Sequence, residues 1–88
     1  MKKILIYGDS NTWGDNFFLG KRIDDDKQWA NILQKKLGSE YKVIQEGLPG
    51  RIAGNFDKEE TFKNGKDSFL SIYKSHAPID ILIIVWLF

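Results

Sequence analysis

Cysteine is absent from this sequence of 88 residues, and histidine occurs once, at position 76. The lack of cysteine excludes disulfide bonds, thiolate nucleophiles and cysteine metal sites. It is typical of a protein in a reducing compartment, and we therefore expect a cytoplasmic location. We expect neither a metal nor an organic cofactor. Asp24, Asp25 and Asp26 are adjacent, whereas a calcium loop needs carboxylates at alternate positions and a glycine, so they are interpreted as a solvated cluster beside a helix start.

An excess of either charge is also missing. The chain has 13 basic and 12 acidic residues, with the signs interspersed, for a net charge of +1. This balance argues against nucleic acid and against an anionic membrane surface as partners. Long apolar runs are missing too. The first is broken at Gly8, and the last, from Ile81 to Phe88, is far shorter than the ~20 residues of a membrane-spanning helix.

The remaining pattern alternates strands with helices. Apolar runs ending at glycine or polar residues are typical of strands buried on both faces, and a stripe of apolar residues at helical spacing (Trp29, Ile32, Leu33 and Leu37) is typical of an amphipathic helix. We predict strands at 4–7, 41–45 and 81–88, and helices at 26–37, capped by Asp26, and at 66–75. Residues 14–25 and 55–65 are predicted as loops. This alternation favours a parallel sheet in a single domain spanning residues 1–88.

Two glycine-bearing loops follow the first two predicted strands. One is Gly8-Asp9-Ser10, and the other runs from Gly47 to Gly54. Ligands of open parallel sheets bind at the carboxyl ends of the strands. A serine just past a buried strand is held rigidly there, and glycines let backbone N–H groups approach a developing oxyanion. The glycine spacing of the second loop does not fit a dinucleotide fingerprint.

The heptapeptide Gly8-Asp9-Ser10-Asn11-Thr12-Trp13-Gly14 resembles the first motif block of the GDSL/SGNH-type serine hydrolases, in its arylesterase-like branch. Residues 47–51, Gly-Leu-Pro-Gly-Arg, resemble the second block. The resemblance implies an ester hydrolase acting on a small ester, with Ser10 as nucleophile and the Gly50 amide in the oxyanion hole. It also implies that Asp9 supports the turn and that Trp13 shapes the pocket wall.

The family's later blocks, Gly-x-Asn-Asp and Asp-x-x-His, are not found in this chain. We interpret the sequence as the N-terminal half of a family domain, shortened by natural truncation or by a frameshift. A serine hydroxyl without a base is a poor nucleophile, and loss of the base costs about 10⁴–10⁶-fold in turnover. We therefore expect weak or no activity from the chain alone. The alternative is a non-catalytic, self-associating α/β remnant.

The resemblance implies a three-layer, flavodoxin-like α/β fold in which the three strands have the order 2-1-3. The third strand, from Ile81 to Phe88, then forms an apolar edge, and such edges tend to pair. We expect a homodimer in which this strand pairs with its symmetry mate.

Two further residues receive structural interpretations. His76 follows the second helix and is placed at the amino end of the sheet, opposite Ser10, so we expect it to be structural or solvent-exposed. Arg51 could attract an anionic substrate, but a surface arginine is the favoured interpretation.

Overall fold

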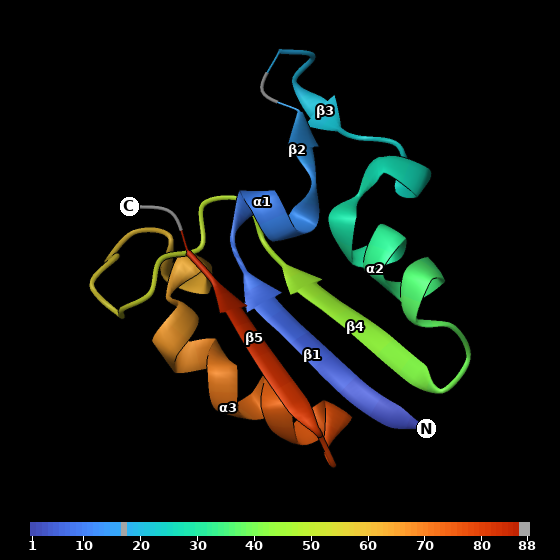
Figure 1. Ribbon diagram of the computed structural model, residues 1–88. Coiled ribbons are helices and arrows are strands. Elements are labelled where there is room, and N and C mark those ends of the chain that lie inside the picture. The colour runs from blue at the N-terminus through green and yellow to red at the C-terminus, as the bar shows by residue number, and fades with distance from the viewer. Residues whose placement is uncertain (17, 87–88) are drawn as a thin grey trace.

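Three parallel strands form the centre of the computed structural model, which describes residues 1–16 and 18–86 (Figure 1). Strand β1 (Lys2–Gly8) lies between β4 (Tyr41–Gly47) and β5 (Ile81–Val85). In the register, Gly8 is paired with Gly47 on one side and with Val85 on the other. The predicted α/β class, the parallel sheet and the strand order 2-1-3 are confirmed.

Strand β1 supplies most of the core. Leu5 and Ile6 are completely buried, and Tyr7 is 1% exposed. Because side chains alternate along a strand, Ile6 packs with Ile4 against one helix layer, whereas the Tyr7 ring faces the other, 5.2 Å from the ring of Phe69. Burial of both faces explains why this strand is a continuous apolar run.

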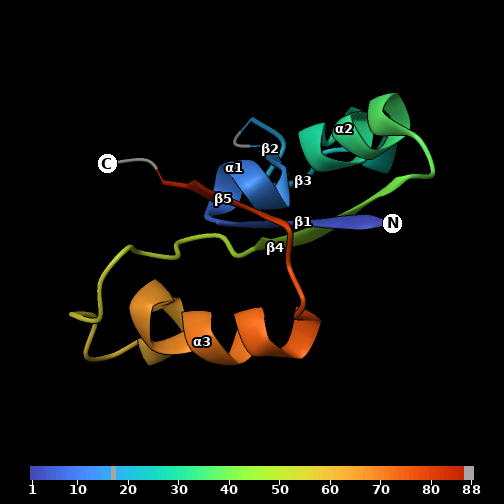
Figure 2. The same ribbon diagram turned by 60° about the horizontal axis from the view of Figure 1, so that its bottom comes forward.

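Helices α2 (Trp29–Leu37) and α3 (Gly65–His76) cover opposite faces of the sheet, which makes three layers (Figure 2). The predicted second helix is confirmed to within one residue at each end. The predicted start of the first helix is wrong, because a single 3₁₀ turn, η1 (Asp25–Lys27), precedes α2. The buried Gln28 separates them, donating from Nε2 to the carbonyl of Ile23 at 3.0 Å, and Asp26 therefore caps nothing.

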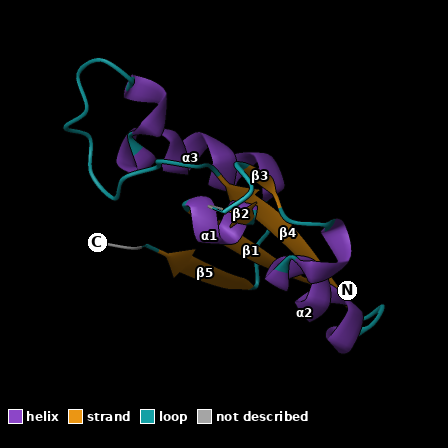
Figure 3. Cartoon of the chain, turned by 90° about the horizontal axis from the view of Figure 1, so that it is seen from above, coloured by secondary structure: helices purple, strands orange, loops and turns teal. Residues whose placement is uncertain are grey.

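Two segments predicted as loops contain ordered structure. Between the short helix α1 (Ser10–Trp13) and α2 lies a small antiparallel pair, β2 (Asp15–Asn16) and β3 (Lys21–Arg22). The pair projects beyond the carboxyl ends of the central strands in Figure 1 and is seen from above in Figure 3.

The second of these segments contains the 3₁₀ turn η2 (Thr61–Lys63). The buried Asn64 holds this loop, because its side-chain amide bonds both the N–H and the C=O of Asp57, at 3.0 and 2.9 Å. Neither segment has a periodic pattern of apolar residues from which its ordered structure could have been predicted.

Strand β5 differs most from its prediction. It was predicted to be a buried strand over 81–88, but it ends at Val85, and Ile81, Leu82 and Ile84 are exposed. Its place at the edge of the sheet is as predicted, because its outer side pairs with no strand among the described residues. Ile84 exposes 50% of its surface. Leu87 and Phe88 lie outside the described residues. No helix in the described part of the chain is long and apolar enough to cross a membrane.

Candidate active site

The segment Gly8-Asp9-Ser10 makes a tight turn at the carboxyl end of β1. Asp9 caps helix α1, where its carboxylate accepts a hydrogen bond from the Asn11 N–H at 3.1 Å. Gly14 closes the helix with a φ of 94°, and its N–H donates to the Ser10 carbonyl at 2.8 Å. Ser10 is the first residue of this helix and is half-buried. The turn is thus fixed at both ends.

Two glycines let α1 rest directly on the strand ends. A β-carbon on Gly8 would overlap the side chain of Thr12 and lie 2.6 Å from the carbonyl oxygen of Val85. One on Gly47 would overlap the backbone of Trp13. Gly8 and Gly47 are register partners, so the two strands end together beneath α1 (Figure 1).

The loop after β4 has a defined turn. The Arg51 N–H donates to the Leu48 carbonyl at 3.1 Å, and Gly50 has a φ of 80°. A proline at the second position followed by a glycine with positive φ is the sequence signature of a type II turn, and Pro49 and Gly50 supply it. The Leu48 N–H donates to the Gly8 carbonyl at 3.2 Å. The loop bearing Gly50 is therefore bonded to the last residue before the turn that bears Ser10.

The structure corrects the interpretation of Arg51 as a surface residue. Only 9% of its surface is exposed. Its guanidinium carbon lies 4.2 Å from the centroid of the Tyr7 ring, and Nη1 donates to backbone carbonyls of the two strands. The position of Arg51 directly after the turn glycine pointed to a place beside the candidate site. Its burial could not be predicted, because the acceptors of its hydrogen bonds are backbone carbonyls, which no residue pattern identifies.

The role of Gln45, the last residue of the strand predicted over 41–45, was not foreseen from the sequence. Its Nε2 donates to the Thr12 carbonyl at 2.9 Å, and its Oε1 accepts from the Gly47 N–H at 3.1 Å. This side chain fastens α1 to β4. Thr12 is completely buried, and its hydroxyl has no hydrogen-bond partner in the described part of the chain.

His76 is the last residue of α3, which ends beside the start of β5, at the other end of the sheet from α1 (Figure 1). Its Nε2 is 3.4 Å from Oε1 of Glu46, and both side chains are about one-third exposed. The His76 carbonyl accepts from Lys3 Nζ at 3.0 Å near the amino end of β1, whereas its ring reaches Glu46 near the carboxyl end of β4. Helix α3 and the helix that begins with Ser10, α1, lie on opposite faces of the sheet (Figure 2).

The remaining sequence candidates have structural contacts. Asp25 accepts a hydrogen bond from Gln28, and Asp24 lies 3.9 Å from the ammonium of Lys27. Within the described residues, no group of three or more His, Cys, Asp or Glu residues is arranged to hold a metal ion. The ring of Trp13 lies beneath the guanidinium of Arg22, and Trp29 packs against the core.

The side chain of Lys63 covers Gly50, the candidate oxyanion donor. A β-carbon on Gly50 would lie 2.8 Å from Cε of Lys63. The Lys63 ammonium pairs with the carboxylate of Glu60, and this hydrogen bond raises the pKa of Lys63 above its ordinary value. The cation therefore stays charged at neutral pH next to the loop.

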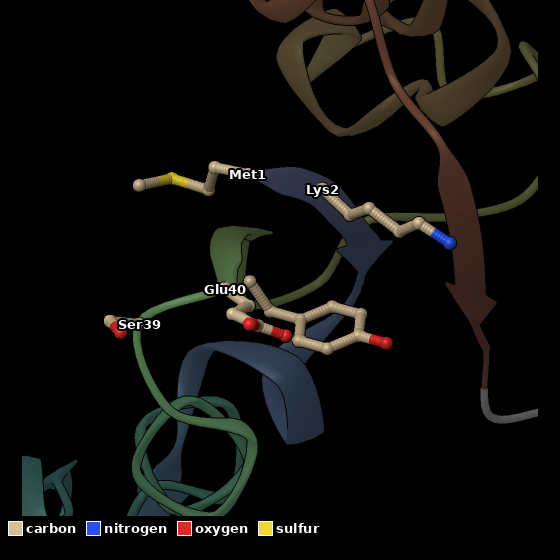
Figure 4. Close-up of a pocket in the computed structure, with 5 residues that line it drawn as sticks. Met1, Lys2, Ser39 and Glu40 are labelled. Carbon is tan, nitrogen blue, oxygen red and sulfur yellow. The ribbon is translucent and has the colours of Figure 1, made fainter.

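A hollow of about 480 Å³ lies at the opposite end of the sheet, lined by Met1, Lys2, Ser39, Glu40 and Tyr41 (Figure 4). It lies at the amino ends of the strands, where ligands of open parallel sheets do not bind. A smaller apolar hollow of about 220 Å³ lies between α3 and β5, lined in part by Tyr7, Phe69 and Ile84. Neither contains Ser10 or Gly50.

Comparison with solved structures identifies relatives of this arrangement. A carbohydrate acetylesterase family member from Sinorhizobium meliloti superposes with a TM-score of 0.89 at 38% identity, over 96% of this chain and 40% of that one. The native aryl esterase of M. smegmatis superposes with a TM-score of 0.87 at 35% identity, over 96% of this chain and 41% of that one. The chain resembles the N-terminal part of a GDSL/SGNH-type serine hydrolase.

The chain thus spans about two-fifths of the length of these two SGNH-type structures. No family model matches its sequence, and no curated protein sequence matches it. The likeness to SGNH-type esterases therefore comes from the fold together with identities above 30%. Both neighbours named here are esterases, which supports the resemblance to an ester hydrolase.

Proposed function

We propose that this chain carries the nucleophile and one oxyanion donor of an SGNH-type ester hydrolase, and that its substrate is a short acyl ester. The supporting observation is the junction at the Gly8 carbonyl. It accepts from the Leu48 N–H, so the turn bearing Ser10 and the turn bearing Gly50 are bonded to one another. Two of the solved structures that the chain resembles are a carbohydrate acetylesterase family member and an aryl esterase.

In this proposal, Ser10 Oγ attacks the acyl carbon, and the Ser10 and Gly50 N–H groups hold the oxyanion. The bond to the alcohol breaks, and water then hydrolyses the acyl-serine, which restores Ser10 and releases the acid. Asp9 supports the turn by capping α1 and does not touch the substrate.

The base that accepts the serine proton comes from water or from a partner. His76, the one histidine of the chain, ends helix α3 on the face of the sheet opposite α1 (Figure 2), and its ring lies beside Glu46. Weak turnover is the consequence, because a serine without an adjacent base is a poor nucleophile. A His76→Ala variant is therefore expected to keep whatever hydrolysis the wild-type chain shows.

The test is hydrolysis of a short-chain p-nitrophenyl ester by the purified chain beside its Ser10→Ala variant. Ser39→Ala is the matched control, because Ser39 is an exposed serine at the opposite end of the sheet. Faster hydrolysis by wild type and Ser39→Ala than by Ser10→Ala supports the proposal. Equal rates for all three refute it.

A second candidate function is supported by the exposed edge of the sheet. Strand β5 contains no charged residue and no proline, the features that protect edge strands from pairing, and its outer side is unpaired in the described part of the structure. In this alternative the chain is a non-catalytic α/β unit that forms a homodimer through β5, with a continuous six-stranded sheet.

A further inference from the structure

The side chain of Arg51 lies at the point where the two candidate catalytic loops leave the sheet. It extends from the turn that contains Gly50 and is buried. Its guanidinium carbon lies 4.2 Å from the centroid of the Tyr7 ring. The Tyr7 hydroxyl in turn donates to the Gly65 carbonyl at 2.6 Å, which holds the ring in place. The guanidinium therefore rests on a ring that is itself fixed.

One nitrogen of this guanidinium bridges two strands. Nη1 donates to the Glu46 carbonyl at 2.7 Å and to the Gly8 carbonyl at 3.2 Å. Gly8 is the last residue of β1, two positions before Ser10, and Glu46 lies at the end of β4, four positions before Gly50. The guanidinium thus links the end of β1, which leads to the candidate nucleophile Ser10, with the end of β4, which leads to the candidate oxyanion donor Gly50.

The Gly8 carbonyl accepts a second hydrogen bond, from the Leu48 N–H. Arg51 and Leu48 therefore hold the same oxygen, and both belong to the Gly50 turn. A shift of the guanidinium would move this turn relative to Gly8, and with it the distance between the two candidate oxyanion donors.

An arginine suits this place for a physical reason. A buried cation must be hydrogen-bonded, and here the acceptors are carbonyl oxygens of the strand ends and the face of an aromatic ring. A planar guanidinium can lie flat on a ring while its edge reaches two acceptors, whereas a lysine ammonium is a compact charge on a flexible stem. No carboxylate bonds this guanidinium in the described residues, and its Nε is buried without a partner.

We infer that Arg51 is a positioning residue, which sets the Gly50 amide against Ser10 by holding the carbonyls of Gly8 and Glu46. The inference rests on the proposed ester hydrolase function. Arg51 touches no substrate in this account. It acts through the backbone, and a displacement of about 1 Å in such a donor is enough to lower turnover roughly a hundredfold.

The experiment compares Arg51→Lys and Arg51→Met with two controls. Lys42→Met removes an exposed cation from strand β4, and Leu33→Ala removes core contacts on the opposite face of the sheet. Each variant is measured for folded fraction by circular dichroism, for kcat and KM on a p-nitrophenyl ester, and for amide hydrogen exchange. The amide of Leu48 reports on the junction independently of catalysis.

We expect the Leu48 amide of Arg51→Lys to exchange at least about tenfold faster, relative to amides in the middle of β1, because its acceptor is no longer held. We expect kcat to fall about tenfold or more with KM within about twofold, the sign of a lost transition-state contact. Lys42→Met should leave both readouts unchanged. Leu33→Ala should lower the folded fraction without selective exposure of Leu48.

Three results would overturn the inference. The first is a folded Arg51→Lys variant in which Leu48 is as protected as in wild type. The second is an equal loss of kcat in Leu33→Ala at equal folded fraction. The third is unfolding of both Arg51 variants where Leu33→Ala folds, which would make Arg51 a requirement of the fold. A wild-type chain without Ser10-dependent hydrolysis refutes the proposed function alone, and the exchange of Leu48 still decides the role of Arg51.

Discussion

Gly47 packs against Trp13 so closely that a β-carbon on Gly47 would overlap the Trp13 backbone nitrogen. This approach brings the end of β4 beneath α1, the helix that begins with Ser10. Because the obstacle is backbone, it cannot move aside as a flexible side chain would. The candidate nucleophile turn therefore depends on a glycine 37 positions away in the chain.

The change Gly47→Ala is expected to destabilise the protein by about 1–3 kcal/mol, the usual cost of overpacking. Urea unfolding measures the free energy. Gly54→Ala is the matched control, because its β-carbon would meet only the ring of Phe56, an exposed side chain that can rotate away. Equal stability of the two variants would contradict the close packing described here.

Gly50 and Gly20 both have a positive φ, of 80° and 63°. Alanine at either position is expected to cost about 1–2 kcal/mol for the left-handed backbone. At Gly50 the added carbon also meets the side chain of Lys63, whereas at Gly20 nothing lies within 4 Å.

These two variants separate stability from catalysis. Only Gly50→Ala is expected to lower ester hydrolysis beyond its loss of folded protein, because only Gly50 is proposed as an oxyanion donor. Measurements of the unfolding free energy and of kcat for both variants show whether the loss of hydrolysis in Gly50→Ala exceeds its loss of folded protein. A loss of kcat in Gly20→Ala as large as that in Gly50→Ala would argue against the assignment.

The exposed edge of β5 gives a prediction on assembly. Ile84→Lys places a charge at a half-exposed position of the strand, so the fold is retained while edge pairing is disfavoured. Sedimentation velocity at micromolar concentration is expected to show a dimer for wild type and a monomer for this variant, with unchanged circular dichroism. A monomeric wild type would refute the dimer.

The sequence predicted the sheet well because β1 and β5 are short apolar runs and because β1 and β4 end at glycines where the chain turns. The alternation of strands and helices predicted a parallel sheet, and the strand order followed from the family resemblance. The start of α2 was wrong because Asp26 has the residue type of a cap, whereas the structure uses a 3₁₀ turn and the inward side chain of Gln28. Residue type alone does not distinguish these arrangements.

The environment of Arg51 was beyond sequence reasoning for another reason. Its partners are the carbonyls of Gly8 and Glu46 and the ring of Tyr7, which come together only when β1 and β4 pair in register. A charged residue in a glycine-rich loop is ordinarily exposed. The pairing register, which a sequence specifies only indirectly, is what buries it.

The central claim is that Ser10 is the nucleophile of an ester hydrolase, and hydrolysis of p-nitrophenyl acetate tests it most directly. The rate of the wild-type chain is compared with that of Ser10→Ala at equal folded concentration, with buffer as the blank and Ser39→Ala as the control. The account predicts a wild-type rate above the blank that Ser39→Ala keeps and Ser10→Ala loses. A wild-type rate equal to that of Ser10→Ala would contradict it.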